Sequence, residues 1–392
     1  MARNITLKAI SEESGVPIST VSAVLRDDPS CYAGKALREK VLSCANRLGY
    51  RPNLIARMLR TQRSEMLGFI LPNTHTYTGL RYMEEIEKLV RHNGYQLLIG
   101  YSLNNAEREE NLLNNFRTRF VDGTIVLFGD TNKPRSYLKN LMKDEYPIVT
   151  IDPPALNVAN FSTDYAFGGS LAARYLLELG HSSFTIVAST GENCIPVRLR
   201  VEGFRKEILN AGKSLSMVVP PTVHSPTSEE PPSQEALVLT GIRVGKRIFT
   251  RTKKPTAIFA SNDEIALGII KAGLRAGLRI PDDISVVGFD GSPASVMAPI
   301  PITTIRQPVE TIAKKAVETL LTLIKKTSGK TGKKSPHSLL VPPELLLKTS
   351  TGPAPHHIPR SRNKQMTKKD SLHKNNTEVK NAEKKLQPCE FS

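Results

Sequence analysis

The sequence lacks the patterns that hold structural metals or disulfide frameworks. Its four cysteines, Cys31, Cys44, Cys194 and Cys389, are scattered over 392 residues, and no two of them form a Cys-x-x-Cys pair. Zinc sites and disulfide scaffolds need cysteines at close, paired spacings. We therefore expect no metal site and free thiols, as is usual in a reducing compartment.

The sequence also lacks long hydrophobic runs. No segment approaches the roughly 20 apolar residues that a membrane-spanning helix requires. The first ten residues are polar and lead directly into a helical pattern, so we expect no signal peptide. Both absences predict a cytoplasmic protein with no membrane partner.

Familiar catalytic motifs are missing as well. The chain contains no G-x-G-x-x-G, no G-x-x-x-x-G-K-[ST], no H-E-x-x-H and no G-x-S-x-G. Its 8 histidines fall mostly in expected loops and in the carboxyl-terminal segment, away from carboxylates and cysteines. We therefore expect no catalytic residues and no cofactor, which favours a binding function over an enzymatic one.

Positive charge is abundant and concentrated at the two ends. The chain has 54 Lys and Arg against 37 Asp and Glu, a formal net charge of +17. Residues 1–63 carry a net charge of +6 and residues 352–392 a net charge of +5. Such a balance indicates a polyanionic partner, either nucleic acid or an acidic membrane surface. The alternative is that the terminal charges only aid solubility.

The pattern of apolar residues divides the chain into three zones. Residues 1–63 read as basic helices, residues 64–351 as alternating strands and helices, and residues 352–392 as a disordered basic tail. Expected strands are Met66–Leu71, Tyr95–Gly100, Val121–Phe128, Ile148–Ile151, Phe184–Ala188, Thr256–Ala260 and Ile284–Phe289. Expected helices are Gly79–His92, Glu107–Arg119, Asp164–Leu179, Arg200–Ala211, Asp263–Ala276 and Val309–Ile324. This alternation predicts doubly wound parallel sheets in two lobes, with a proline-rich loop at Pro220–Ser233.

The segment Thr6–Leu25 reads as a helix, a tight turn and a second helix. Gly15 stands where the first helix must end, at a position that favours a left-handed backbone. Pro17 is tolerated at the start of the next helix because its missing amide hydrogen would have no helical partner. A third helix is expected over Gly34–Leu48. Three short helices with a basic surface are typical of a helix-turn-helix DNA-binding module.

Several ordered motifs carry a resemblance to a known family. The amino-terminal stretches are ITLKAISEESGVPISTVSAVLR and REKVLSCANRLGYRPNLIARMLRT; later ones are VDGTIVLF, LAARYLLELGH, RLRVEGFR, FASNDEIALGIIKA, IPDDISVVGFD and ITTIRQP. Together, over roughly residues 5–350, the chain resembles the lac repressor (LacI/GalR) family of transcriptional regulators. The resemblance implies a helix-turn-helix domain (1–52), a hinge helix and linker (53–63) and a two-lobed periplasmic-binding-protein-like core (64–351).

The resemblance also implies a function. A member of this family is a sequence-specific transcriptional regulator, commonly a repressor, that binds a palindromic DNA operator as a homodimer. A small-molecule effector, such as a sugar or related metabolite, binds between the lobes and changes the affinity for DNA. The protein would then act on the bacterial nucleoid.

The family pattern transfers DNA-binding roles onto particular residues. They are Thr6, Pro17, Ile18, Ser19, Thr20, Ser22, Ala23, Arg26, Tyr50, Asn53, Ala56, Arg57, Leu59 and Arg60. The resemblance places Ile18, Ser19 and Ala23 against the bases, and Leu59 as a wedge in the minor groove. Ala23 stands where the family usually has arginine, which predicts a readout less dependent on guanine. Leu59 packed into the core is the alternative to the wedge.

Five residues match the effector-binding positions of the family. They are Tyr77, Asp164, Arg200, Asn262 and Asp290. Asn262 and Asp290 each follow an expected strand, where open α/β sheets place ligand-binding residues. Asp164 and Asn262 can equally be helix caps, and the two roles can coexist. The loop Asn73–Thr78 departs from the family pattern, so the identity of the effector stays open.

The main alternative is a solute-binding protein built on the same α/β core. Such a protein would bind a ligand without preferring any DNA sequence. The basic helical module and the expected absence of a signal peptide favour the regulator. Gel-shift titrations in increasing salt separate the two, because operator affinity falls steeply with salt.

Overall fold

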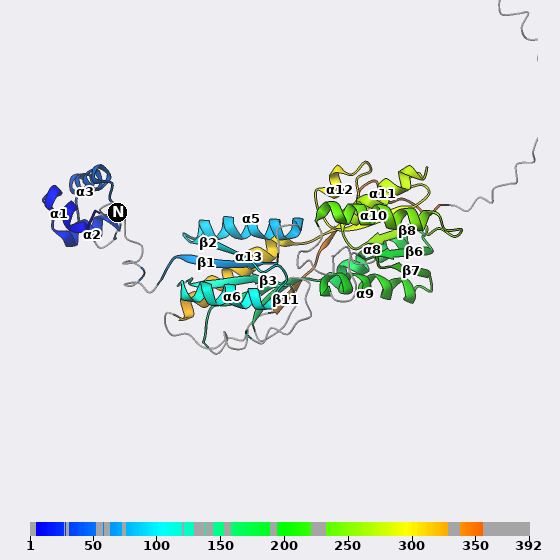
Figure 1. The fold of residues 1–392 in the computed structure, drawn as a ribbon, viewed down its shortest axis with the longest axis horizontal. Coiled ribbons are helices and arrows are strands. Elements are labelled where there is room, and N and C mark those ends of the chain that lie inside the picture. The colour runs from blue at the N-terminus through cyan, green and yellow to red at the C-terminus, as the bar shows by residue number, and fades with distance from the viewer. Residues whose placement is uncertain are drawn as a thin grey trace, which may run out of the picture. The chain divides into compact units, whose positions relative to one another are not determined.

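The computed structural model of the chain describes residues 5–26, 28, 31–51, 58, 63–72, 76–119, 121–128, 137, 144–152, 158–188, 194–220, 233–327 and 338–355. These residues form an amino-terminal helical module and two α/β lobes, each with its own sheet (Figure 1). Within them, no helix is long and apolar enough to cross a bilayer.

The helical module contains α1 (Leu7–Ser14), α2 (Ile18–Leu25) and α3 (Lys35–Leu48). Helix α1 begins at Thr6, whose side chain accepts a hydrogen bond from the Ala9 amide at 3.3 Å. It ends at Gly15, which has a left-handed φ of 66°, as its sequence position predicts. The buried residues are Ile10, Val16, Val21, Val24, Val41, Cys44 and Ala45. The three helices therefore share one small apolar core.

The first lobe is built on a six-stranded sheet in the order β11-β5-β4-β3-β1-β2. Its strands are β1 (Met66–Leu71), β2 (Gln96–Tyr101), β3 (Gly123–Leu127), β4 (Ile148–Ile151), β5 (Ala159–Thr163) and β11 (Ser338–Val341), all paired in parallel. Helices α5 (Tyr77–His92) and α13 (Val309–Thr327) pack on one face, and α6 (Ala106–Thr118) packs on the other. Burial on both faces explains why the central strands β1, β3 and β4 are rich in apolar residues.

The second lobe repeats this plan in the order β12-β10-β9-β8-β6-β7. Its strands are β6 (Ser183–Val187), β7 (Ser214–Val218), β8 (Ala257–Ala260), β9 (Ser285–Asp290), β10 (Thr303–Arg306) and the antiparallel edge strand β12 (Glu344–Leu346). Helices α8 (Tyr165–Glu178) and α9 (Ile195–Asn210) pack on one face. Helices α10 (Gln234–Phe249) and α11 (Asp263–Arg275) pack on the other, and a short helix α12 (Ala294–Met297) follows β9.

The chain passes between the two lobes three times within the described residues. The passages join β5 to α8, β10 to α13, and β11 to β12. Each lobe is consequently assembled from segments that are far apart in sequence. Residues at the passages, such as Asp164 and Gln307, are brought to the boundary between the sheets by this topology.

The structure confirms the fold class and extends the expected set of elements. The seven predicted strands and six predicted helices are present, with ends shifted by a few residues, most at α9, which begins at Ile195 rather than Arg200. Strands β5, β7, β10, β11 and β12 and helices α10 and α12 were not predicted. Most of the predicted loop Pro220–Ser233 lies outside the described residues.

The carboxyl-terminal boundary needs a correction. The sequence predicted a tail from Gly352 onward, but ordered contacts continue to Ala354. The Ala354 amide donates a hydrogen bond to the Leu179 carbonyl at 2.8 Å, and the Gly352 amide donates one to the Ser285 hydroxyl at 3.1 Å. Apolar periodicity cannot reveal such contacts, because backbone groups make them. The predicted tail beyond Pro355 lies outside the described residues.

Candidate DNA-binding surface and effector site

Helix α2 presents one face to the module core and another to solvent. Val21 and Val24 are buried, whereas Ile18 is 48% exposed. Pro17 and Ser19 are also exposed, and Thr20, Ser22 and Ala23 are half-buried. A large apolar side chain held in solvent at the start of this helix is available to touch a thymine methyl group. The geometry is compatible with the predicted base contacts.

Other predicted DNA contacts also have local roles. Thr6 caps α1, and its hydroxyl hydrogen stays available to a phosphate. The Arg26 guanidinium donates to the Ser22 carbonyl at 3.0 Å and lies 3.8 Å from Asp28. Tyr50 packs against the module core, and burial raises the pKa of its phenol. The predicted hinge residues Asn53, Ala56, Arg57, Leu59 and Arg60 lie outside the described residues.

The centre of the candidate effector site is a buried ion pair in the second lobe. The Arg200 guanidinium on α9 lies 2.9 Å from the Asp290 carboxylate at the end of β9. It also donates to the Ser261 carbonyl at 2.6 Å and stacks 3.9 Å from the centroid of the Phe289 ring. Burial raises the pKa of Asp290, and the charge of Arg200 opposes this shift. Sequence reasoning named both residues, and the structure brings them together.

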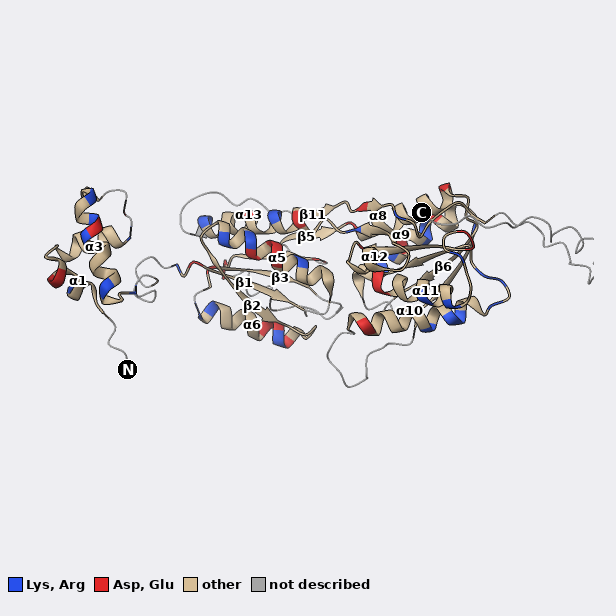
Figure 2. Cartoon of the chain, turned by 90° about the horizontal axis from the view of Figure 1, so that it is seen from above, with Lys and Arg blue, Asp and Glu red and all other residues tan. Residues whose placement is uncertain are grey.

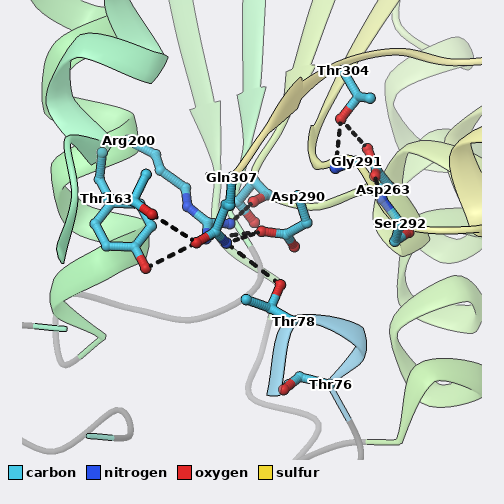
Figure 3. Close-up of polar contacts among 12 residues, drawn as sticks. Thr76, Thr78, Thr163, Arg200, Asp263, Asp290, Gly291, Ser292, Thr304 and Gln307 are labelled. Carbon is cyan, nitrogen blue, oxygen red and sulfur yellow. Dashed lines mark hydrogen bonds and ion pairs between the residues drawn. The ribbon is translucent and has the colours of Figure 1, made fainter. Parts of the chain in front are cut away.

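The backbone of Asp290 is held in an unusual conformation. Its φ of 110° is rarely adopted by residues other than glycine. The two amides that follow are both anchored: Ser292 N donates to Asp263 Oδ2 at 2.6 Å, and Gly291 N donates to Thr304 Oγ1 at 3.3 Å. Thr304 in turn donates to Asp263 Oδ1 at 2.6 Å (Figure 3). These hydrogen bonds stabilise the strained backbone conformation in which the Asp290 carboxylate faces Arg200.

Gln307 is a site residue that sequence reasoning missed. It is buried, and its amide donates to Asp290 at 2.7 Å. Its carbonyl oxygen accepts from Thr163 at 3.0 Å (Figure 3). The same oxygen lies 3.2 Å from the Tyr165 hydroxyl. Thr163 belongs to the first lobe and Asp290 to the second, so Gln307 bridges the two. The available signal was its place directly after a strand, in the motif ITTIRQP.

A second polar link joins the lobes beside Gln307. The Tyr165 hydroxyl donates to Asp152 Oδ1 at 2.8 Å. Burial raises the pKa of Tyr165 well above its usual value, and the Asp152 charge raises it further. The phenol therefore stays protonated and serves as a donor across the boundary. The position of Thr78, 3.5 Å from the Gln307 amide, adds a first-lobe hydroxyl to the same group.

The other predicted effector residues occupy structural positions in this arrangement. Asp164 caps α8 by accepting from the Phe167 amide, and Asn262 caps α11 by accepting from the Ile265 amide, both at 2.9 Å. Tyr77 is the first residue of α5, and its hydroxyl accepts from Arg81. Both caps were weighed in the sequence interpretation, and capping leaves a second lone pair free for a ligand.

The described residues hold no group of three or more His, Cys, Asp or Glu that is suited to a metal ion. Asp263, Glu264 and Asp290 are neighbours, but hydrogen bonds from Ser292, Thr304 and Gln307 occupy their oxygens. Burial raises the pKa of Asp263 well above its usual value, and the charge of Asp290 adds to this shift. These carboxylates shape the loop at Asp290.

Comparisons with known proteins agree with this architecture. A family model described as bacterial regulatory proteins, lacI family, matches residues 6–53, and one described as a periplasmic binding protein-like domain matches residues 173–351. The chain is 28% identical over 319 residues to catabolite control protein A of Priestia megaterium, covering 81% of this chain and 92% of the relative. It is 29% identical to the HTH-type transcriptional regulator DegA of Bacillus subtilis (strain 168), covering 89% and 98%.

Solved structures show the same fold. The lac repressor dimer bound to operator and the anti-inducer ONPF has a TM-score of 0.75 at 22% identity, covering 89% of this chain and all of that chain. The transcriptional regulator CelR in complex with cellobiose has a TM-score of 0.59 at 21% identity, covering 88% of this chain. At these identities the likeness establishes the fold alone.

A helix-turn-helix module joined to a two-lobed, periplasmic-binding-protein-like core defines a class of DNA-binding regulators. The described geometry and the two family models both place this chain in that class. Its amino-terminal domain, residues 6–53, matches the lacI family of bacterial regulatory proteins. The curated relatives that the chain resembles are transcriptional regulators.

Proposed function

We propose that this protein represses transcription by binding a palindromic operator as a homodimer, and that a small molecule between its lobes changes that binding. The supporting observation is the joint presence of an exposed recognition helix, α2, and a buried polar group that links two lobes. The first feature suits the major groove. The second suits a ligand whose binding shifts the lobes between two arrangements.

The proposed effector is a neutral, hydroxyl-rich molecule such as a sugar or a related metabolite. Arg200, Asp290, Gln307 and the hydroxyls of Thr78 and Thr163 offer both donors and acceptors within one small region. Sugar hydroxyls need such a mixture, because each donates and accepts. Asp164 and Asn262 would add acceptors at the ends of their helices.

Selection of bound duplexes from a random DNA pool tests the operator. We expect the full chain to enrich a palindrome, with two half-sites that reflect the two-fold symmetry of the dimer. Affinity for the enriched duplex should fall steeply between 50 and 200 mM salt. If no duplex is enriched over bulk genomic fragments, with or without added metabolites, the operator proposal is wrong.

The competing function, ligand binding without an operator, makes a different prediction. A solute-binding protein would be stabilised by its ligand in a thermal-shift screen of sugars and nucleosides but would enrich no DNA. Ligand binding stabilises the native state by mass action in either case. The random-pool selection therefore decides between the functions, and the screen identifies the effector.

The hinge prediction is tested separately. Replacing Leu59 with serine should weaken binding to the selected operator far more than binding to random duplex, because a wedge acts at one central base step. An equal loss on both DNAs would remove the wedge role from Leu59.

A further inference from the structure

One edge of the second-lobe sheet gathers the starts of four strands. Ser214 N donates to Ser182 O at 3.1 Å, and Thr256 N donates to Ser183 O at 2.9 Å. These contacts place the first residues of β6, β7 and β8 side by side, and β9 pairs next to β8. In a parallel sheet the covering helices return to this edge, so α9, α10 and α11 end here. Asp290 lies at the opposite edge.

Seven exposed cations lie at this edge, which we call the basic edge. They are Lys213, Lys246, Arg247, Arg251, Lys253, Lys254 and Arg275. Six Lys and Arg fall within residues 243–254, and no acid interrupts them. Figure 2 shows this blue concentration at the far end of α10.

No carboxylate in the described ranges forms a salt bridge with any of the seven cations of the basic edge. Nearby acids are already engaged: Asp283 pairs with Arg279 at 2.7 Å, and Glu207 pairs with Arg174 at 2.7 Å. The hydrogen bond from Arg279 is the largest cause of the lowered pKa of Asp283, and the charge of Lys254 is a smaller one. Glu178, at the end of α8, is a single carboxylate beside the seven cations of the basic edge.

The helix dipole explains only part of this charge. Lys246, Arg247 and Arg275 stand in the last turns of α10 and α11, where cations are favoured. Arg251, Lys253 and Lys254 lie beyond α10, in the connection to β8, where the dipole has faded. Neighbouring like charges repel one another, so their clustering is costly unless a polyanion binds.

The described chain also ends at this edge. Ala354 N donates to Leu179 O at the end of α8, and the sequence after it holds nine Lys and Arg against four acids.

We propose that the basic edge binds the phosphates of a duplex DNA segment other than the operator. Phosphate contacts by Lys and Arg need no sequence recognition and are driven by counterion release. A single strand is disfavoured, because such sites add aromatic platforms for base stacking, and the exposed aromatic residues of the described core, Tyr101 and Phe167, lie elsewhere. The inference is independent of the operator, although operator binding would let one dimer hold two DNA segments.

The test compares two variants with the same change in charge. Lys253→Glu/Lys254→Glu alters the basic edge, and Lys314→Glu/Lys315→Glu alters an adjacent lysine pair on α13 of the first lobe. The full chain is titrated against a fluorescently labelled 30-base-pair duplex of random sequence at 50 to 200 mM salt. We expect the first variant to bind five- to twenty-fold more weakly, with a salt slope reduced by about two. The second should stay within two-fold of the unaltered chain.

Equal affinities of the two variants for random duplex would overturn the proposal and would point instead to an acidic protein partner. The outcome does not depend on the operator, since random duplex is the probe. A bead-bound operator from the selection, if one emerges, gives a further readout: the unaltered chain should capture labelled random duplex, and Lys253→Glu/Lys254→Glu should lose this capture while keeping operator affinity within two-fold. Failure to select any operator would count against the proposed function alone.

Discussion

Arg200 and Asp290 illustrate how a buried charge pair constrains a site. Each ion loses its hydration in the lobe interior, and the attraction between the two ions offsets part of this loss. Arg200 also donates to the Ser261 carbonyl, and Asp290 accepts from the Gln307 amide. Such a pair is costly to break, because the remaining ion is left uncompensated. The pair therefore fixes one geometry at the boundary between the lobes.

Replacing Asp290 with asparagine should lower the free energy of unfolding by about 3–5 kcal/mol, because Arg200 would stay buried without a counter-ion. Urea denaturation followed by circular dichroism measures the change. The double variant Arg200→Met/Asp290→Asn should recover much of the loss. Glu207→Gln, which breaks the exposed pair with Arg174, is the control and should have little effect. A single variant as stable as this control would show that the pair is hydrated.

His181 offers a second residue-scale prediction, on pH. Its Nε2 lies 3.1 Å from the Gly352 carbonyl, which can only accept, so Nε2 carries the proton. Nδ1 is buried and has no partner among the described residues. Protonation would place a charged N–H there without an acceptor, and burial accordingly lowers the pKa of His181.

The sign of the pH effect follows from this shift. Below the ordinary histidine pKa of about 6.5, the unfolded state takes up the proton more readily than the folded state. Stability should therefore fall as the pH drops from 7 to 5, and thermal unfolding over this range measures it. His181→Asn should flatten this dependence at the cost of some stability at pH 7. An unchanged slope would mean that other groups dominate.

Helix pairing in the second lobe depends on glycines at the contact points. Gly169 on α8 and Gly203 on α9 let the two helices approach so closely that an added Cβ would collide with backbone carbonyls, of Arg200 in the first case and Ala166 in the second. The backbone of Arg200 lies in this contact, and its side chain reaches the Phe289 ring. The contact between α8 and α9 therefore helps to position Arg200 in the candidate effector site.

Gly169→Ala should destabilise the fold by about 1–3 kcal/mol or more, because backbone atoms cannot move aside as side chains do. Gly100→Ala in β2 is the comparison: its Cβ would lie 3.1 Å from the flexible end of Leu112, which can shift. Thermal unfolding of both variants measures the difference. Equal losses would show that the α8–α9 contact yields as easily as a side chain.

The same elements show what the sequence can and cannot reveal. Long amphipathic helices such as α5 and α13 and wholly buried strands such as β3 were predicted, because burial imposes their apolar pattern directly. Edge strand β7 was missed because its residues are mostly exposed and lack an apolar run. Gln307 was missed because its role arises from contacts with Thr163 and Tyr165, more than 140 positions away.

At the scale of the whole chain, the contacts of Gly352 and Ala354 predict that the core ends near Pro355. A chain ending at Pro355 should unfold at the same temperature as the full chain. A chain ending at Thr351 should be less stable, because it lacks the Gly352 and Ala354 contacts to His181, Ser285 and Leu179. Differential scanning calorimetry distinguishes the two. If both truncations unfold alike, residues 352–355 contribute nothing to the core.

The three passages between the lobes have a consequence for biosynthesis. Helix α13 and strand β11 complete the first lobe, yet they are encoded after nearly all of the second. A growing polypeptide therefore cannot complete its first sheet until Val341 has left the ribosome, and until then the edge of β5 that pairs with β11 stays unpaired. The second lobe, whose β6 to β10 emerge as one block, can gain structure earlier, so maturation of the nascent protein should proceed from its later-coded half back to its earlier one.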